Sequence, residues 1–444
     1  MRIDHRVAMT LRQIMLMNFG FFGIQYSFGL QQTAVNPIYT FLGADPGQLP
    51  LLNMAGPVTG LLVQPLIGAL SDRTWVDGLG RRRPYFLIGA IGCSVCLFFY
   101  PHVTALWMAV LMLWLLDISN NTAMEPYRAF IADTLPESQQ GTGFLMQSVF
   151  TGLGITLANV SLWIFQQFDF FNRATESGIP FWVYGSFYLG AVCSIGSILI
   201  SVFSTKEHKP SDEELAALRA QPKGLGVAVK DIFSAIKEMP KPLRQLALVY
   251  LFQWYALFIY WQFSTLSIAK SVQWAEIPEG KTAFDLAVGW TGLVNGWYNI
   301  VTFISAFGLM ALAKKYAAKQ VHAACLSLAA IALLIFPHIS NQYLLFIPMI
   351  GFGIAWASIM GVPFLIAVAE VPQERYGVYM GIINMMIVIP MLIETVTFGT
   401  IYKYLLGDNP TNAMMFAGVL LGLAAVFTLM IQTRQRAGGD EKSA

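Results

Sequence analysis

Charged residues are scarce in this chain. Asp, Glu, Lys and Arg make up 12% of its 444 residues, whereas soluble globular proteins contain about 25%. Hydrophobic residues make up 56%, and the mean hydropathy is +0.58. A chain with so little charge cannot cover a water-exposed surface, so the composition indicates an integral membrane protein.

Cysteine is also rare, and all four cysteines fall in apolar segments. Cys93 and Cys96 form a C-x-x-C pattern, but no histidine or further cysteine lies near them. Small core residues are a better explanation than a metal or redox site. The other two are Cys193 and Cys325. We therefore expect no metal and no cofactor.

Enzyme signatures are absent as well. The sequence contains no H-E-x-x-H, no G-x-S-x-G and no Walker loop, so we do not expect an enzyme. A net charge of +2 is too small to imply a nucleic-acid partner. The histidines lie near predicted loops or helix ends: His5, His102, His208, His322 and His338.

Long apolar runs predict twelve membrane-spanning helices, because about 20 residues cross the hydrocarbon core. They form an N-terminal six-helix bundle (1–203) and a C-terminal six-helix bundle (243–433), with a linker (204–242) and a tail (434–444). The linker either carries an amphipathic helix on the membrane surface or is a flexible tether. The predicted helices are 10–35, 48–71, 84–101, 104–132, 141–167, 180–203, 243–270, 285–313, 319–337, 342–369, 376–403 and 411–432.

The distribution of basic residues predicts the orientation. The N-terminus lacks a small-residue cleavage site, so its apolar run is expected to be a retained first span. If both termini are cytoplasmic, 23 of the 27 Lys and Arg residues lie on that side, as the positive-inside rule requires. The four exceptions are Arg173, Lys270, Lys281 and Lys403.

The two halves of the chain resemble each other. Residues 131–141 (IADTLPESQQG) follow the fourth predicted helix, and residues 368–377 (VAEVPQERYG) follow the tenth. Both read apolar, Ala, acid, apolar, Pro, acid and Gly, allowing a one-residue gap. Six plus six parallel repeats, with a site near the midplane between them, is the architecture of major facilitator transporters.

The fourth predicted helix carries an unusual number of polar residues. An isolated charge at mid-bilayer costs about 2.5–3.5 kcal/mol on insertion scales, so such residues usually mark a pathway. At 100° per residue, four of them fall on one face of the helix. These four are Asp117, Asn121, Glu125 and Arg128.

The loop after the second predicted helix contains a recognisable signature. Residues 68–86 read GALSDRTWVDGLGRRRPYF, which resembles the G-x-x-x-D-R…G-R-R loop of the major facilitator superfamily. The resemblance implies that Arg73 pairs with Asp133, the acid that ends the fourth helix. Plain positive-inside charge is the alternative. The expected gating latch comprises Asp72, Arg73, Arg81, Arg128 and Asp133.

Residue spacing in two motifs narrows the resemblance to one family within this superfamily. S-D-R…G-R-R-R-P in the loop and D-x-x-N-N…P-x-R-A…A-D in the fourth helix resemble the sucrose/proton symporters of plants and their animal and bacterial relatives, of the glycoside-pentoside-hexuronide type. The resemblance implies that Asp117 accepts the proton during uptake of a sucrose- or maltose-type glucoside. Glu125 departs from the glycine common in plant members. The matching residues are Asp117, Asn120, Asn121, Pro126, Arg128, Ala129, Ala132 and Asp133.

The residues themselves support a coupling role for Asp117. A carboxyl group in a partly dry cavity can take up a proton on one side and release it when the cavity opens to the other. Arg128 is about 16 Å away along the helix, too far for a salt bridge. Segment 51–70 of the second helix contains no acid, which favours protons over sodium, because carriers of the melibiose-permease type place an aspartate pair there. Glu394, another unpaired acid within a span, is the second candidate proton site.

A sugar site needs amides and acids for the hydroxyl groups and flat apolar surfaces for the ring faces. Each candidate also has a structural explanation, since Asn and Gln join helices and Trp and Tyr occupy membrane interfaces. Asn295 and Asn299 share a face at i, i+4. The candidates are Gln25, Asn121, Glu125, Gln147, Trp254, Tyr255, Asn295, Asn299, Trp356 and Asn384.

Together these features predict a major facilitator protein that imports a disaccharide with a proton by alternating access. We expect a monomer in lipid, in a bacterial inner membrane. An exporter of drugs or other solutes and a non-transporting membrane sensor are the alternatives, and a counterflow assay separates them.

Overall fold

The computed structural model describes residues 8–168, 173–176, 178–207, 237–370 and 376–432. Within them it is all-helical, and the only β contacts are two isolated bridges. The linker segment expected to carry an amphipathic helix and the tail 434–444 lie outside the described residues. The all-α prediction is confirmed.

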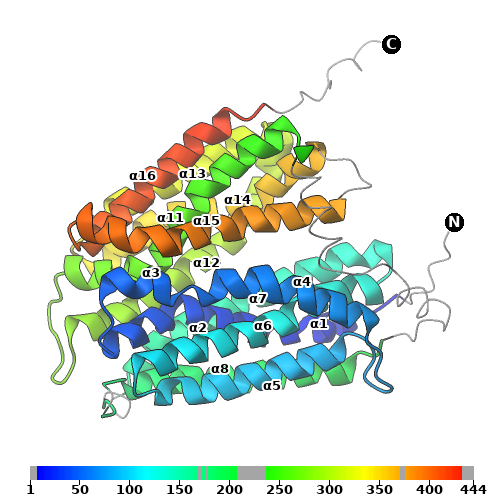
Figure 1. The fold of residues 1–444 in the computed structure, drawn as a ribbon, viewed down its shortest axis with the longest axis horizontal. Helices are drawn as coiled ribbons and strands as arrows, with labels where there is room; N and C mark the ends of the chain where they lie inside the picture. Colours follow the sequence, from blue (N-terminus) through cyan, green and yellow to red (C-terminus); the bar gives the residue numbers. More distant parts are fainter. Residues whose placement is uncertain (1–7, 169–172, 177, 208–236, 371–375, 433–444) are drawn as a thin grey trace.

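The N-terminal half contains six long helices, which occupy one layer of the molecule (Figure 1). A short helix, α1, precedes the first of them, and η1 and α3 precede the second. Their bounds are α1 Leu11–Asn18, α2 Gly20–Phe41, η1 Pro46–Gln48, α3 Leu49–Leu52, α4 Ala55–Arg73, α5 Arg83–Phe99, α6 Leu106–Thr134, α7 Glu137–Gln166 and α8 Phe181–Ser204.

The C-terminal half contributes six more long helices, stacked on the first layer in Figure 1. Among the described residues, nine helices are long and apolar enough to span a membrane by themselves. The other long helices of the described chain are α2, α6 and α12. The C-terminal bounds are α11 Lys241–Ser271, α12 Ala283–Lys315, α13 Ala318–Ile335, α14 Phe346–Glu370, α15 Tyr376–Tyr404 and α16 Pro410–Leu429.

Local sequence explains where several helices begin. Proline occupies the first turn of α5, α11 and α16, where its missing N–H costs nothing and its fixed φ suits the helix. A capping box starts α12, with the Thr282 and Asp285 side chains each accepting the other's backbone N–H. Short-range signals therefore mark where these four helices begin.

The two halves meet at one end of the bundle, which we call the distal end and define by the loops 42–45, 272–282 and 405–409. There Gln166 of α7 donates from Nε2 to the Asp285 carbonyl at 2.7 Å, and Lys281 donates to the Gln166 carbonyl at 3.1 Å. The backbone of η1 also approaches α15, because a Cβ on Gly399 would lie 2.4 Å from the Gly47 carbonyl oxygen. The distal end is closed.

Three glycines allow α12 to lie against α7 of the other half. Gly289, Gly292 and Gly296 fall on one face of α12, and an added Cβ would meet an α7 atom at 2.0, 2.2 and 2.7 Å respectively. For Gly292 that atom is the backbone oxygen of Asn159, which no rotamer change can move. Small residues permit such close helix approach in membranes.

We expect Gly292→Val to prevent closure of the distal end, because its side chain would occupy the space of the Asn159 carbonyl. Spin labels on Gln167→Cys and Glu279→Cys, in a chain whose four native cysteines are replaced by alanine, should report a longer distance in double electron–electron resonance. Gly308→Val is the matched control on the same helix, since an added Cβ there meets nothing within 4 Å. Equal distances in both variants would contradict the glycine explanation.

Candidate functional site

Asp117 lies in the middle of α6 and is only 3% exposed. Its carboxyl group faces α4, since a Cβ on Gly56 would lie 3.6 Å from Asp117 Oδ2, and it also lies beside the Gln31 side chain of α2. No described residue forms an ion pair with it. Three helices of the N-terminal half therefore surround an acid for which the described residues provide no cationic partner.

Asn121, one turn after Asp117, is fixed by α4. Its Nδ2 donates to Thr59 Oγ1 at 3.1 Å and to the Asp117 carbonyl at 2.9 Å, and its Oδ1 accepts from Gln64 Nε2 at 2.7 Å. Gln64, which the sequence analysis missed, thus brings a second amide to the helix face that carries Asp117. Amides held in this way are pre-positioned for a polar ligand.

Asn120 has a structural role instead. Its Nδ2 donates to Ser27 Oγ at 2.8 Å, and its Oδ1 accepts from the Cys93 thiol at 2.8 Å. The side chains of Asn120 and of its two partners are fully buried. The C-x-x-C pattern therefore contributes a packing and hydrogen-bonding residue to the core of the N-terminal half.

Glu125 and Arg128 form a separate pair further along α6. Arg128 Nη1 lies 3.8 Å from Glu125 Oε2, and the side chains are 48% and 38% exposed. Exposed pairs of this kind contribute little stability. The predicted shared face is thus divided, with Asp117 and Asn121 buried and this pair in the open. Arg128 contacts Glu125, whereas the sequence analysis had grouped it with the latch.

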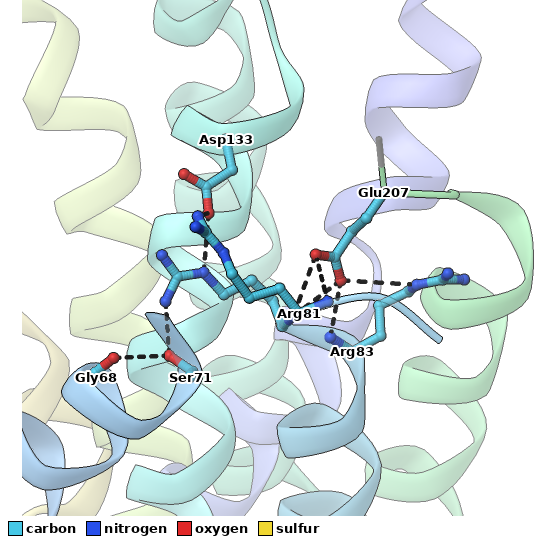
Figure 2. A network of polar contacts seen from close by, with 7 residues as sticks. Gly68, Ser71, Arg81, Arg83, Asp133 and Glu207 are labelled. Atoms are coloured by element: carbon cyan, nitrogen blue, oxygen red, sulfur yellow. Dashed lines mark hydrogen bonds and ion pairs between the residues drawn. The ribbon is translucent and has the colours of Figure 1, made fainter. Parts of the chain in front are cut away.

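The latch acid Asp133 is bound by two arginines of the loop before α5 (Figure 2). Its Oδ2 accepts from Arg81 Nη2 at 2.6 Å and from Arg82 Nε at 2.8 Å. Arg82 also donates from Nη1 to Ser71 Oγ at 2.6 Å, so α6, the loop and α4 are joined. The expected partner Arg73, with Asp72, has its side chain outside the described part of the chain.

A second acid, Glu207, was missed by the sequence analysis. Its carboxylate accepts the backbone N–H groups of Arg81, Arg82 and Arg83 at 2.8, 2.9 and 3.0 Å (Figure 2). Gly80 has a φ of +88° and leaves space for the Glu207 side chain, with which a Cβ at this position would clash. An anion at the start of α5 is favoured by the helix dipole. Glu207 thereby ties the segment after α8 to the same loop.

In the C-terminal half, three tryptophans form an aromatic cluster. The ring of Trp356 on α14 packs edge-on against Trp254 and Trp261 of α11, with centroids 5.9 and 5.6 Å apart. The indole Nε1 atoms of Trp254 and Trp261 are buried without a hydrogen-bond partner in the described protein. Tyr255, also on α11, is bonded through its hydroxyl to Thr397 at 2.8 Å. Trp261 was not among the predicted residues.

Asn295 connects the two halves. Its Oδ1 accepts from the Tyr260 hydroxyl at 2.7 Å, and its Nδ2 donates to Thr33 Oγ1 of α2 at 3.0 Å. Thr33 in turn donates to Asn159. Asn299 shares the face, as predicted from the spacing, and donates to the Asn295 carbonyl at 2.8 Å. In this conformation both polar atoms of the Asn295 side chain are hydrogen-bonded to protein groups. The bond to Thr33 joins the two halves and helps to close the distal end.

The remaining predicted residues are dispersed. Gln25 packs against α7, where a Cβ on Gly154 would lie 3.1 Å from its Cβ. Gln147 is buried, with Nε2 lacking a partner among the described residues, and Asn384 is half-buried. Glu394 lies fully buried between α15 and α11, where Gln262 donates to it. Among the described residues, no hydrogen bond joins any two of these four.

We expect Arg82→Leu to destabilise the connection between the loop before α5 and helices α4 and α6, because it removes the bonds to both Asp133 and Ser71. Loss of charge-assisted hydrogen bonds of this kind costs about 1–3 kcal/mol, which a lower thermal unfolding midpoint of the purified protein should show. Arg81→Leu is the control, since the one bond that the described residues provide for its side chain is to Asp133, and it is more exposed than Arg82. An equal shift in the two variants would argue against the proposed importance of Arg82.

Comparisons with known proteins agree with this architecture. Residues 17–395 match the Major Facilitator Superfamily. The Sucrose transport protein SUT5 of Oryza sativa subsp. indica is 24% identical over 85% of this chain and 80% of its own length. The Sucrose transport protein SUC4 of Arabidopsis thaliana is 25% identical over 92% of this chain and 88% of its own.

A solved structure shares the fold. The crystal structure of the nucleoside transporter NupG superposes with a TM-score of 0.68 at 14% identity, covering 95% of this chain and 98% of that one. At that identity the likeness concerns the fold alone. Because the family match extends over most of the chain, this integral membrane protein belongs to the Major Facilitator Superfamily.

Proposed function

We propose that this protein is a proton-coupled symporter that imports a disaccharide, sucrose or a related glucoside such as maltose, by alternating access. The observation that carries the proposal is Asp117, a buried acid at mid-span without a cationic partner among the described residues. The sucrose transport proteins among its relatives support the choice of substrate. A carboxyl group in such a place marks an ion or substrate pathway.

In this proposal Asp117 is the group that changes charge. It takes up a proton while the cavity is open to the outside, and neutralisation removes the cost of carrying a bare carboxylate through a dry, occluded state. Opening to the cytoplasm rehydrates the site, and the proton leaves. The adjacent amides of Gln64 and Asn121, held by one another, would bind the sugar on the N-terminal side.

The C-terminal half supplies the apolar part of the site. The Trp254 and Trp356 rings offer flat surfaces of the kind that pack against sugar ring faces, and the Trp254 indole N–H has no protein partner in the described chain. An unbonded donor next to an aromatic face suits a hydroxylated ring. Binding across both halves would couple substrate to the rocking of one half against the other.

Orientation and cellular setting complete the proposal. With both termini cytoplasmic, the closed distal end faces outward and the exposed Glu125 and Arg128 pair faces the release side. The protein works as a monomer in a bacterial inner membrane, needs no cofactor besides the proton, and catalyses no covalent reaction. The latch around Asp133 then lies at the cytoplasmic surface.

We expect Asp117→Asn to abolish sugar accumulation driven by a proton gradient and to retain sugar counterflow, because the amide cannot exchange a proton. Radiolabelled sucrose and maltose in proteoliposomes measure both activities. Asp77→Asn, an identical change in an exposed loop, is the control and should leave both unchanged.

The same assay separates the alternatives. Unchanged accumulation in Asp117→Asn would refute coupling through this residue. Binding of the sugar without counterflow would identify a sensor. Competition by hydrophobic cations rather than by glucosides would identify an exporter of another solute class.

We expect Trp356→Ala to raise the KM for sugar, since it removes the ring that both other tryptophans contact. An aromatic contact contributes about 0.5–1.5 kcal/mol beyond its buried area, so the rise should approach about tenfold. Trp107→Ala removes a mostly exposed indole from α6 and is the matched control. If the two variants had equal KM values, the aromatic cluster would not be part of the site.

A further inference from the structure

Glu394 and Gln262 form an isolated polar pair inside the C-terminal half. Glu394 of α15 is 0% exposed and Gln262 of α11 is 1% exposed. Gln262 Nε2 donates to Glu394 Oε2 at 3.3 Å. The second oxygen of each side chain, Glu394 Oε1 and Gln262 Oε1, is buried and has no hydrogen-bond partner in the described protein. Two acceptors are thus left unsatisfied on two side chains that already touch.

An ionised Glu394 would be poorly compensated. No described residue forms an ion pair with it, and it accepts one long hydrogen bond. A buried carboxylate without a cation is far less stable than its neutral form. Each unsatisfied buried acceptor adds a further cost. The charged form therefore fits this environment badly.

A single proton on Glu394 would satisfy both of the unpaired acceptor atoms. If Glu394 carries a proton on Oε1, that oxygen becomes a donor and Gln262 Oε1 becomes its acceptor, which closes a ring of two hydrogen bonds between acid and amide. Exchanging the amide N and O of Gln262 leads to the same result, because its oxygen would then face Glu394 Oε2 and again require a proton between them.

We propose that Glu394 is a resident proton-binding site, whose proton is shared with Gln262 and ties α15 to α11. The proposal goes beyond coupling through Asp117, because it assigns the second buried acid a proton that stays bound through the cycle. Glu394 has no exposed surface, so its proton has no contact with either aqueous phase in this conformation. Asp117 and Glu394 thereby have different roles.

The surroundings of Glu394 contain few groups that would stabilise its ionised form. Among the described residues of α11, Tyr255 is the titratable group near Glu394, and its hydroxyl is bonded to Thr397. η1, α3 and α4 also pack on α15, and α16, which contains no charged residue, contacts it through Phe416. Asp45, just before η1, faces α15 at the distal end, beside Tyr402. No described lysine, arginine or histidine pairs with Glu394.

Infrared spectroscopy of the purified protein tests the proposal without relying on transport. We expect a carboxylic-acid C=O band at neutral pH that resists deuterium exchange when the protein is transferred into D2O, and that shifts when the protein is labelled with ¹³C-glutamate but not with ¹³C-aspartate. The band should persist in Asp117→Asn and disappear in Glu394→Gln. Gln262→Met, which removes the acceptor, should move it to higher frequency. Isotope labelling of the wild-type chain assigns the band to a buried glutamate even if a variant fails to fold, and Glu394→Gln then assigns it to this residue.

Transport by Glu394→Gln provides the second readout. The amide copies the shape of the neutral acid, so we expect gradient-driven accumulation to persist. A missing glutamate band in the wild-type protein, or its survival in Glu394→Gln, would overturn the proposal. Lost accumulation with intact counterflow in Glu394→Gln would also overturn it, since the proton would then be cargo. If the wild-type protein moves no sugar at all, the proposed function fails while the infrared result still decides the state of Glu394.

Discussion

Every polar group inside the hydrocarbon layer must find a partner within the protein, because no water is there to replace one. The backbone meets this requirement by forming long helices. Many side chains meet it within their own helix, as when Thr122 donates to the Ile118 carbonyl and Thr291 donates to the Ala287 carbonyl. A hydroxyl bonded one turn back can face lipid or a neighbouring helix at little cost. The buried polar atoms that find no such partner within their own helix are therefore informative.

The two buried acids illustrate how differently the requirement can be met. Glu394 meets a single amide, and a proton on the acid completes the set of hydrogen bonds within one half of the molecule. Asp117 lies on a helix face that continues toward the exposed pair of Glu125 and Arg128. A group near a route to water can change its charge, whereas a group sealed in protein is fixed in one state. In the proposed mechanism, location more than residue type separates Asp117 as a coupling acid from Glu394 as a structural one.

The sequence predicted the helices well and their partners poorly, for a physical reason. Composition and length determine a span, so the predicted helix 104–132 is found as α6, Leu106–Thr134. Partners depend on how distant segments pack. The expected contact of Asp133 with Arg73 rested on a motif, whereas its described contacts are with Arg81 and Arg82, and no local pattern marked Glu207. Likewise, helical spacing correctly placed Asn295 and Asn299 on one face. Only the packing of the two halves shows that the Asn295 amide already donates to Thr33.

The contacts that close the distal end are suited to being broken. They include single hydrogen bonds, such as Asn295 to Thr33 and Gln166 to Asp285, close backbone approaches at glycines on α12, and the edge-on ring contact of Phe284 with Phe41. Hydrogen bonds between membrane helices average only about 0.6 kcal/mol in double-mutant cycles, so a few of them hold the halves without locking them. The cores of the two halves, by contrast, are extensive clusters of buried apolar side chains. Rigid halves joined by weak, specific contacts can rock against each other, and a ligand bound between them needs only a small difference in affinity to decide which end is open.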